Sequence, residues 1–529
     1  MTTTRRRFLA AGAGALAFGP AFWRSALAGA QVVAGPGPYG PLRAADANGL
    51  RLPAGFTSRI VARANQLVPG TAYPWHVFPD GGATFPLRGG GWALACNSES
   101  LAASGAGTSA IRFAPDGRIA GAYRILAGTN ANCAGGPTPW GTWLSCEEYD
   151  GGHVWECDPT RAGQGAIRPA MGTFNHEAAC VDPAGRRVYM TEDKGDGGLY
   201  RFTPSRYPDL SDGLLEVAVV GAGEAVSFQE VPDPSAITGP TRTQVAGMKR
   251  FNGGEGIWFD SGHVYFSTKG DNRVWDLDVA AGALTVLYDA AELGADAPLR
   301  GVDNLTVTRA GELYVCEDGD DMEVCLIAAD RTVAPFLQVV GAAAAGPADR
   351  GNELAGVAFN PAGDRMYFSA QRAFGFGVTY EVRGPFAGAG SPPAPAPARR
   401  PRARAAELVV RAPARVTLAQ LRRGVTIEVR STHAGRAVAA LRSWQLGRVP
   451  GKRGSTFRPR NVTVARRERS VAAGSNTIRL KAAPRALARL RKRRSTATRL
   501  TVQVRAADGR IHVVTRQIRV VARRRERQS

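Results

Sequence analysis

The sequence predicts an all-β protein: a six-bladed β-propeller, a Pro/Ala-rich linker and a small, basic, β-sandwich-like domain. The first observation behind this prediction is a repeated theme, in which a polar turn containing glycine is followed by alternating apolar residues. It recurs between about residues 90 and 383, for example in VDPAGRRVYMTED (181–193) and FDSGHVYFSTKGD (259–271). The second is charge: residues 386–529 carry 36 Lys+Arg and 5 Asp+Glu, a net of +31, whereas residues 1–385 have a net of −9. A split this steep indicates two domains with different partners.

Residues 1–28 have the features of a targeting segment and are not expected to belong to the fold. Three arginines at 5–7 precede a short apolar stretch, and the sequence ALA at 26–28 offers a small-residue cleavage site. TRRRFL (4–9) resembles the twin-arginine (Tat) signal. The apolar run is shorter than the ~20 residues of a membrane span and contains Gly and Pro, which argues against an anchor. We therefore expect Tat export to a periplasmic, cell-wall-associated or secreted location, with no transmembrane anchor after cleavage.

Residues 29–385 are expected to form the propeller. Gly or Pro-x-Gly in a turn, followed by period-two apolar residues, is the signature of a β-hairpin. No stretch of this region shows a sustained helical period. Short strands that recur every ~40–80 residues are typical of a propeller. Five or six blades fit the length, and we expect six.

Two different segments follow the propeller. Residues 386–405, FAGAGSPPAPAPARRPRARA, cannot bury a core and are expected to form a stiff, extended linker. Residues 406–529 contain alternating runs such as GVTIEVRS and RLTVQVRAADGRIHVV, which predict strands of a small β-sandwich with arginines on its outward face. The stretch PRALARLRKRRS (484–495) also fits one or two basic helical turns.

Acidic residues recur at the starts or ends of the predicted propeller strands, one or two in each blade. In a propeller such positions converge on the axial channel or its mouth. Carboxylates that gather there repel one another and acquire raised pKa values unless a cation neutralises them, so the recurrence predicts a polynuclear metal site. Solvated turn residues are the alternative explanation for any single position. The acidic positions are Glu99, Glu147, Glu148, Glu177, Glu192, Asp193, Glu255, Asp303, Glu317, Asp318 and Glu353.

Seven cysteines, an odd number, all lie in the acidic domain, so at least one cannot be in an internal disulfide. Cys146 and Cys157 flank one predicted hairpin, and Cys316 and Cys325 flank another. Both pairs sit where hairpin partners would face each other, and an exported location permits bridging. Cys133 fits no such pairing. Carboxylates suit Ca²⁺ and Fe³⁺ alike, and a thiolate among them favours a redox-capable metal such as iron.

Five segments, in order along the chain, resemble the motifs of the PhoX-type alkaline phosphatases. They are CAGGPTPWGTWLSCEE (133–148), GTFNHEAACVDPAGRRVYMTEDKGDGGLYRF (172–202), FNGGEGIWF (251–259), GVDNLTVTRAGELYVCED (301–318) and ELAGVAFNPAGDRMYFSAQ (353–371). The likeness extends over roughly residues 50–383, and the first segment is the most specific. It implies a six-bladed propeller with iron and calcium at the axial mouth, which hydrolyses phosphate monoesters outside the cytoplasmic membrane.

The resemblance also implies roles for single residues. Cys133 is expected to be the thiolate ligand of iron, with either Glu147 or Glu148 reaching the cluster from the end of its strand; a buried apolar role is the alternative for Cys133. His176 is expected to pack beside the site rather than to bind metal. The metal ligands that we expect are Cys133, Glu99, Glu148, Glu177, Glu192, Glu255, Asp303 and Glu353.

One position departs from the family pattern. Phosphatase members tend to have an arginine, which would bind phosphate, two residues before the glutamate that aligns with Glu255, and this sequence has Gly253 there. Lys269 and Arg300 are candidates to replace that arginine.

Besides a metal-dependent phosphoesterase for a phosphorylated small molecule, two functions stay open: a non-catalytic calcium-bound propeller that serves as an envelope binding or scaffold protein, and a single-metal propeller hydrolase such as a lactonase. The sequence contains no G-x-S-x-G, P-loop or H-E-x-x-H motif.

The basic C-terminal domain is expected to fold independently and to bind anionic cell-envelope polymers through its charge. Specific nucleic-acid binding is not expected, because Trp444 and Phe457 are nearly the only rings available for stacking on bases. The domain could also pair with the propeller of its own chain, which has a net charge of −13 once residues 1–28 are removed.

Overall fold

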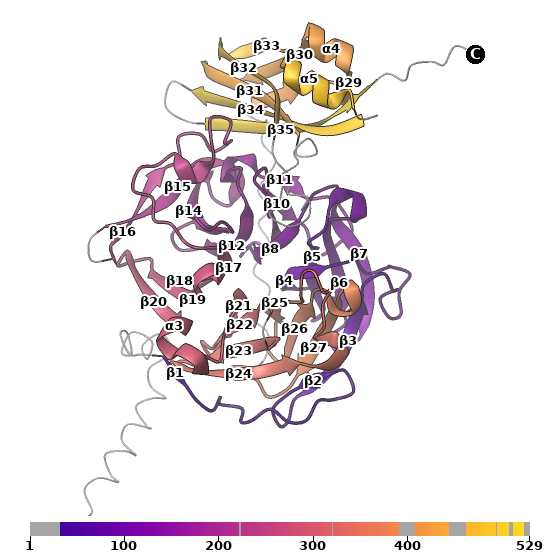
Figure 1. Ribbon diagram of the computed structural model, residues 1–529, viewed down its shortest axis with the longest axis vertical. Coiled ribbons are helices and arrows are strands. Elements are labelled where there is room, and N and C mark those ends of the chain that lie inside the picture. The colour runs from indigo at the N-terminus through magenta and orange to yellow at the C-terminus, as the bar shows by residue number, and fades with distance from the viewer. Residues whose placement is uncertain are drawn as a thin grey trace, which may run out of the picture.

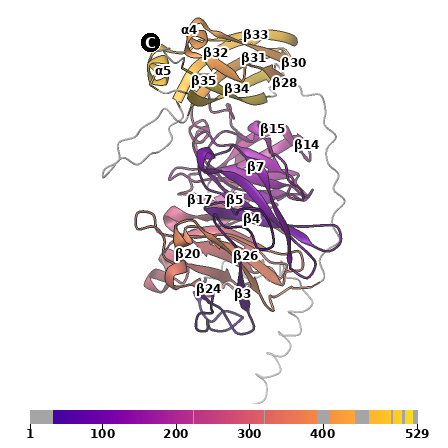
Figure 2. The ribbon, with the colours of Figure 1, turned by 90° about the vertical axis from the view of Figure 1, so that its right-hand side faces the viewer.

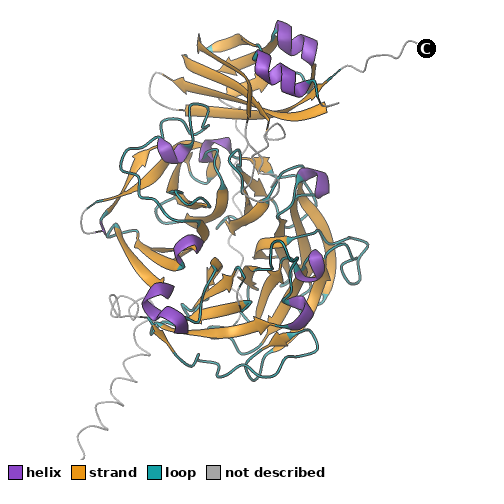
Figure 3. Ribbon diagram, in the orientation of Figure 1, coloured by secondary structure: helices purple, strands orange, loops and turns teal. Residues whose placement is uncertain are grey.

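The computed structural model describes residues 32–221, 224–319, 321–390, 408–443, 462–492, 495–506 and 511–522. The expected signal peptide at 1–28 and most of the expected linker at 386–405 lie outside this range. In the described residues the protein is mostly β, with a few short helices (Figure 3). None of the described helices has the length and apolar character needed to cross a membrane.

Six sheets follow one another along the chain from residue 57 to residue 383 in the described part of the protein (Figure 1). The first has strands β4 (Pro79–Pro86), β5 (Trp92–Ser98), β6 (Gly107–Phe113) and β7 (Ile119–Ala127). The second has β8 (Asn132–Pro137), β9 (Trp143–Glu147), β10 (Val154–Cys157) and β11 (Ala166–Ile167). The third has β12 (His176–Asp182), β13 (Arg187–Glu192), β14 (Leu199–Arg206), β15 (Asp209–Val220) and β16 (Val226–Glu230).

The other three sheets have the same antiparallel order. The fourth consists of β17 (Gly254–Asp260), β18 (His263–Thr268), β19 (Arg273–Asp278) and β20 (Ala283–Asp289). The short helix α3 (Ala290–Leu293) follows β20 in the chain. The fifth consists of β21 (Val302–Val307), β22 (Leu313–Glu317), β23 (Glu323–Ile327) and β24 (Thr332–Val339), with β1 (Val33–Ala34) and β2 (Leu50–Arg51) paired to β24. The sixth consists of β25 (Leu354–Phe359), β26 (Arg365–Ala370), β27 (Val378–Arg383) and β3 (Thr57–Arg63).

The six sheets form a closed, propeller-like ring. The first strand of each sheet contacts the first strand of the next, in the order β4, β8, β12, β17, β21 and β25, and β25 contacts β4 again. The sixth sheet is completed by β3, which pairs with β27, so a strand from the N-terminal side of the ring closes it. Side chains of β12 alternate between the two faces of the third sheet: Ala179 and Val181 pack in one apolar cluster and Cys180 packs in another. Both faces are apolar because a neighbouring sheet covers each of them.

Residues 408–522 form a second β-rich unit, which lies beside β14 and β15 at one end of the molecule (Figures 1 and 2). Alternation along β30, where Ile427 and Val429 are buried and Glu428 and Arg430 are exposed, places one apolar core between its two sheets. One sheet holds β28 (Leu408–Arg411), β30 (Val425–Ser431) and β33 (Gly474–Leu480). The other holds β29 (Arg415–Thr417), β35 (Ile511–Val521), β34 (Ser495–Ala506), β31 (Gly435–Ser443) and β32 (Val462–Val471); the helices are α4 (Leu418–Arg423) and α5 (Pro484–Leu490).

Neither hairpin pair forms a disulfide, because all seven cysteines are free thiols. Cys316 pairs across the hairpin with Val324, and Cys325 pairs with Val315, so the two cysteines are one residue out of register. Since side chains alternate between the faces of a sheet, this offset points the thiols to opposite sides. Cys146 and Cys157 are offset by three residues and likewise belong to different apolar clusters.

Candidate metal centre

Each of the six sheets has a register shift near the start of its innermost strand. The shifts fall between Pro79 and Gly82, Asn132 and Gly135, His176 and Ala179, Gly254 and Ile257, Val302 and Leu305, and Ala355 and Ala358. Such bulges redirect side chains away from the regular alternation of a strand. In five sheets the first residue inside the shift is a potential metal ligand: Asp80, Cys133, Glu177, Glu255 and Asp303.

In four of these five sheets the ligand is followed by glycine or alanine, because the inner strands run very close together. A Cβ atom on Gly81 would lie 2.4 Å from the Cα atom of Ala134 in the next sheet. A Cβ atom on Gly256 would lie 2.6 Å from the backbone nitrogen of Leu305. Real Cβ atoms do not approach backbone this closely, so the pattern of an acid followed by glycine brings neighbouring ligands together as well as turning them inward.

Potential ligands on the inner strands and the turns beside them form three groups, within each of which the donor atoms lie within 4.8 Å of one another; a fourth group, Glu317, Glu323 and Cys325, belongs to the fifth sheet. Two groups share Glu177 and the third contains acids of the first and sixth sheets. The groups are Cys133, Glu148 and Glu177; Glu177, Glu255 and Asp303; and Asp80, Glu99 and Glu353. We call these eight residues the axial cluster.

Glu177 is the member that most clearly lacks a partner. Its side chain is 1% exposed, and neither carboxylate oxygen has a hydrogen-bond partner among the described residues. A buried carboxylate in this state is costly unless it is protonated or binds a cation. Because Glu177 belongs to two of the three groups, it would be shared between the ions that these groups hold.

Burial raises the pKa of every carboxyl group in the axial cluster, and neighbouring carboxylates raise most of them further. Withdrawal from water and the Asp80 carboxylate raise the pKa of Glu99 to about 7. Burial raises the pKa of Glu255 to about 8, although Lys269 opposes the shift. The pKa of Glu177 and that of the Cys133 thiol are raised well above their usual values, again by burial first. Without cations the cluster therefore holds protons, and the thiol donates a hydrogen bond to Asp80 at 3.4 Å.

Two cationic side chains border the cluster. Lys269 Nζ lies 2.8 Å from Glu255 Oε1 and 3.1 Å from Asp318 Oδ2. Arg372 Nη1 lies 2.6 Å from Glu353 Oε2, and its Nη2 lies 3.6 Å from Glu99 Oε2. Two cations cannot balance seven carboxylates, so the arrangement favours additional positive ions.

The structure brings together seven of the eight residues predicted as metal ligands and places Glu192 elsewhere. The Glu192 carboxylate accepts hydrogen bonds from Arg242 Nη1 at 3.0 Å, from the Tyr200 hydroxyl at 2.8 Å and from the backbone N–H of Gly198 at 3.1 Å. These donors satisfy it away from the cluster. Arg300 also faces away, since its guanidinium donates to the carbonyl oxygens of Gly294 and Ala295.

Sequence reasoning missed Asp80, Arg372 and Gln371. Asp80 begins the bulge of the first sheet and precedes two glycines, the same acid–glycine pattern that marks Glu255. That pattern could have identified it. Gln371 Nε2 donates to carboxylates of both Asp80 and Glu99, and nothing in its local sequence signals this contact.

The segment 133–148 holds the cluster in place as well as contributing to it. Trp143 Nε1 donates to Asn97 Oδ1 at 3.0 Å, and Trp140 Nε1 donates to Glu156 Oε1 at 2.8 Å, so both indoles anchor the second sheet. Of the two adjacent glutamates, only Glu148 belongs to the axial cluster. His176 is buried, stacks on Phe174 and has a pKa lowered to about 3 by burial, as expected for a packing role.

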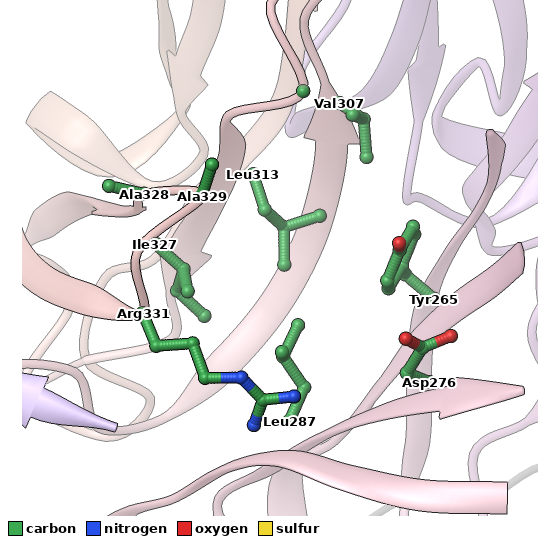
Figure 4. A pocket seen from close by; sticks show the side chains of 10 residues that line it. Tyr265, Asp276, Leu287, Val307, Leu313, Ile327, Ala328, Ala329 and Arg331 are labelled. Carbon is green, nitrogen blue, oxygen red and sulfur yellow. The ribbon is translucent and has the colours of Figure 1, made fainter. Parts of the chain in front are cut away.

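A pocket of about 40 Å³ on the fourth and fifth sheets does not offer comparable chemistry (Figure 4). Its walls include Leu287, Val307 and Leu313, and none of its lining residues belongs to the axial cluster. Its one carboxylate, Asp276, pairs with His263 at 2.8 Å. This pocket therefore lacks a set of converging catalytic groups.

Comparison with known proteins identifies the family. The sequence matches the family described as Alkaline phosphatase PhoX over residues 92–151, 149–274 and 260–373, more than half of the chain. The chain belongs to the PhoX alkaline phosphatase family. The PhoX match includes all of the axial cluster except Asp80, and it confirms the resemblance seen in the sequence motifs. No curated protein matches the chain.

Solved structures give weaker likenesses. A Bacteroides thetaiotaomicron protein of unknown function is 10% identical with a TM-score of 0.39, covering 62% of this PhoX chain and 76% of that one. A luciferin-regenerating enzyme is 13% identical with a TM-score of 0.33, covering 60% and 94%. A putative 6-phosphogluconolactonase from Bacteroides uniformis is 16% identical with a TM-score of 0.32, covering 54% and 80%.

The donor atoms present fit several hard cations and, at one position, a softer metal ion. Asp80, Glu177, Glu255 and the other acids supply oxygen donors only, which suits Ca²⁺, whereas Cys133 adds a sulfur donor beside Glu148 and Glu177. The unpartnered oxygens of Glu177 are the structural observation that favours a bound cation at this position.

Proposed function

We propose that the protein is an exported, metal-dependent phosphatase built on a six-bladed β-propeller, which hydrolyses phosphate monoesters of small molecules. The observation that supports this most directly is the axial cluster with Glu177 at its centre, in a chain of the PhoX family. We assign iron to the group of Cys133, Glu148 and Glu177, because it alone of the three contains sulfur. We assign calcium to the two all-oxygen groups. Export would use the Tat-like segment at residues 1–28.

Cations bound at these groups would polarise the oxygens of a phosphate and lower the pKa of a bound water to make it a nucleophile. The protein's own part begins with charge. The seven carboxylates outnumber the two cations Lys269 and Arg372, so without metal ions the cluster would repel a phosphate dianion. The acids would therefore attract the substrate only through the metal cations that they bind.

Lys269 and Arg372 are then the candidate phosphate-binding groups. Each is a donor at the border of the cluster, and each is partly exposed, with side chains 35% and 15% accessible. Lys269 follows β18 of the fourth sheet and Arg372 follows β26 of the sixth, with the fifth sheet between them, so they can donate to different phosphate oxygens. Lys269 lies beside Gly253, since a Cβ atom on Gly253 would be 3.9 Å from the Lys269 Cβ. It thus occupies the region where the family arginine is expected.

The test combines metal analysis with turnover of an aryl phosphate. We expect purified protein to contain iron and calcium, to hydrolyse the ester and to lose activity on chelation. Lys269→Met and Arg372→Met should each reduce kcat/KM by roughly 10- to 150-fold, the value of one charge-assisted contact of about 1.5–3 kcal/mol. Calcium without iron, and no turnover, would instead support the non-catalytic calcium-bound scaffold.

A further inference from the structure

The basic C-terminal domain inserts one arginine into the propeller beside the axial cluster. Arg499 of β34 is 5% exposed although it belongs to the most basic part of the chain. Its Nη1 donates to the carbonyl oxygen of Gly151 at 2.7 Å and to His153 Nδ1 at 2.6 Å. Its Nη2 lies 3.3 and 3.2 Å from the two carboxylate oxygens of Glu147. All three partners lie on the turn at residues 147–153, between β9 and β10.

These contacts determine the tautomer of His153 and the charge pairing of Glu147. An arginine only donates hydrogen bonds, so His153 must accept at Nδ1 and carry its proton on Nε2, which lies 3.1 Å from Thr173 Oγ1. Burial and Arg499 both lower the pKa of His153, in agreement with a neutral ring. Glu147 is fully buried, and Arg499 is the only cationic side chain that pairs with it among the described residues.

The same turn carries Glu148 of the axial cluster. Glu147 and Glu148 are adjacent, and their side chains serve different partners: Glu147 faces Arg499, and Glu148 lies with Cys133 and Glu177. The turn has little freedom, because a Cβ atom on Gly152 would lie 1.9 Å from the carbonyl oxygen of Glu147. Movement of Glu147 is therefore transmitted to Glu148.

We propose that Arg499 is a positioning residue for Glu148, so that docking of the C-terminal domain controls cation binding in the propeller. The part of this inference that concerns cations rests on the proposed function. Residues that orient a metal ligand without binding the metal themselves typically change metal affinity 10- to 100-fold when they are removed. The C-terminal domain is on this view part of the site and not a detachable appendage.

The test compares three full-length variants with the wild type. Arg499→Gln removes the charge, Arg499→Lys keeps the charge but loses the fork that reaches Gly151, His153 and Glu147 together, and Arg505→Gln is the matched control. Arg505 lies on the same strand and crosses the same domain boundary, but its guanidinium contacts Glu230 and the carbonyl oxygen of Pro232, away from the turn. The measurements are hydrogen–deuterium exchange of residues 147–153 and iron affinity in competition with a chelator, because Glu148 belongs to the group assigned to iron.

We expect faster exchange in the turn and an at least tenfold weaker iron affinity for both Arg499 variants, with both values within twofold of wild type for Arg505→Gln. Should Arg499→Gln fail to fold, Arg499→Lys decides alone. Wild-type exchange and iron affinity in Arg499→Lys would overturn the proposal, as would equal losses in Arg505→Gln. A wild type without bound iron or calcium would contradict the proposed function instead, and exchange in the turn would still test the role of Arg499.

Discussion

Removal of bound cations should make the protein less stable as the pH rises from about 5 to about 8. In the cation-free state burial raises the pKa of Glu99 to about 7 and that of Glu255 to about 8. Their ordinary value, which the unfolded chain recovers, is 4.5. Between these values the folded protein binds more protons than the unfolded chain. The free energy of unfolding must therefore fall with rising pH, and the stability that is present below pH 4.5 is lost as the pH passes 7 and 8.

The magnitude can be worked out for Glu99 alone. A rise in pKa from 4.5 to about 7 corresponds to roughly 3 kcal/mol of unfolding free energy. The propeller spans residues 57–383, and an unfolding entropy of about 2 cal/mol/K per residue converts 3 kcal/mol into a fall in Tm of roughly 4 °C. Glu255 and the more strongly shifted acids should add to this value.

The assay is thermal unfolding followed by circular dichroism at one scan rate, for chelated and for Ca²⁺-loaded protein, at pH values from 5 to 8.5. The chelated Tm should fall across this range, and the loaded Tm should stay nearly constant because cations keep the carboxylates ionised. Glu99→Gln, which cannot ionise, should lessen the fall. A chelated Tm that is constant or rises with pH would refute the reasoning, since the buried acids would then be ionised without a metal.

Three other outcomes are expected. Cys133→Ala should lose iron, measured by elemental analysis, while far-UV circular dichroism shows an unchanged fold; full iron occupancy would show that the thiol is no ligand. Gly256→Ala should destabilise the protein by about 1–3 kcal/mol through its contact with Leu305, whereas Gly121→Ala, which meets no atom within 4 Å, should not. Adsorption of the full chain to anionic cell-wall polymer should collapse between 0.1 and 1 M salt, as the Debye length falls from ~10 to ~3 Å; salt-resistant adsorption would exclude a charge-driven mechanism.

Local patterns in the sequence contain much of the fold and of the candidate site. Glycine turns and period-two strands predict the hairpins because both depend on neighbouring residues only. Acids at the starts of strands, such as Glu255 and Asp303, predict the cluster because the bulge that turns them inward is itself a local feature. Asp80 carries the same signal and was missed because the repeated theme was traced only from about residue 90 onward.

Features that depend on register or on distant contacts could not be predicted in this way. Glu192 occupies a strand end like the true members of the cluster, but Arg242, fifty residues later, binds its carboxylate. Cys316 and Cys325 face opposite sides because of a one-residue offset that hairpin length alone does not reveal. The docking of Arg499 on Glu147 joins residues 352 positions apart and depends on the shapes of two folded domains.

The ring formed by the six sheets has a seam, and one ligand group lies across it. Asp80 and Glu99 belong to the first sheet and Glu353 to the sixth, while Gln371, which follows β26, already bonds to both acids of the first sheet. The ring closes only when β3 pairs with β27, a contact between distant parts of the chain that is slow to form. A cation at this group would join the two sides of the seam and would have to leave before they separate. Its occupancy should therefore set the rate at which the folded protein opens, and with it the time for which the protein survives exposure to a protease.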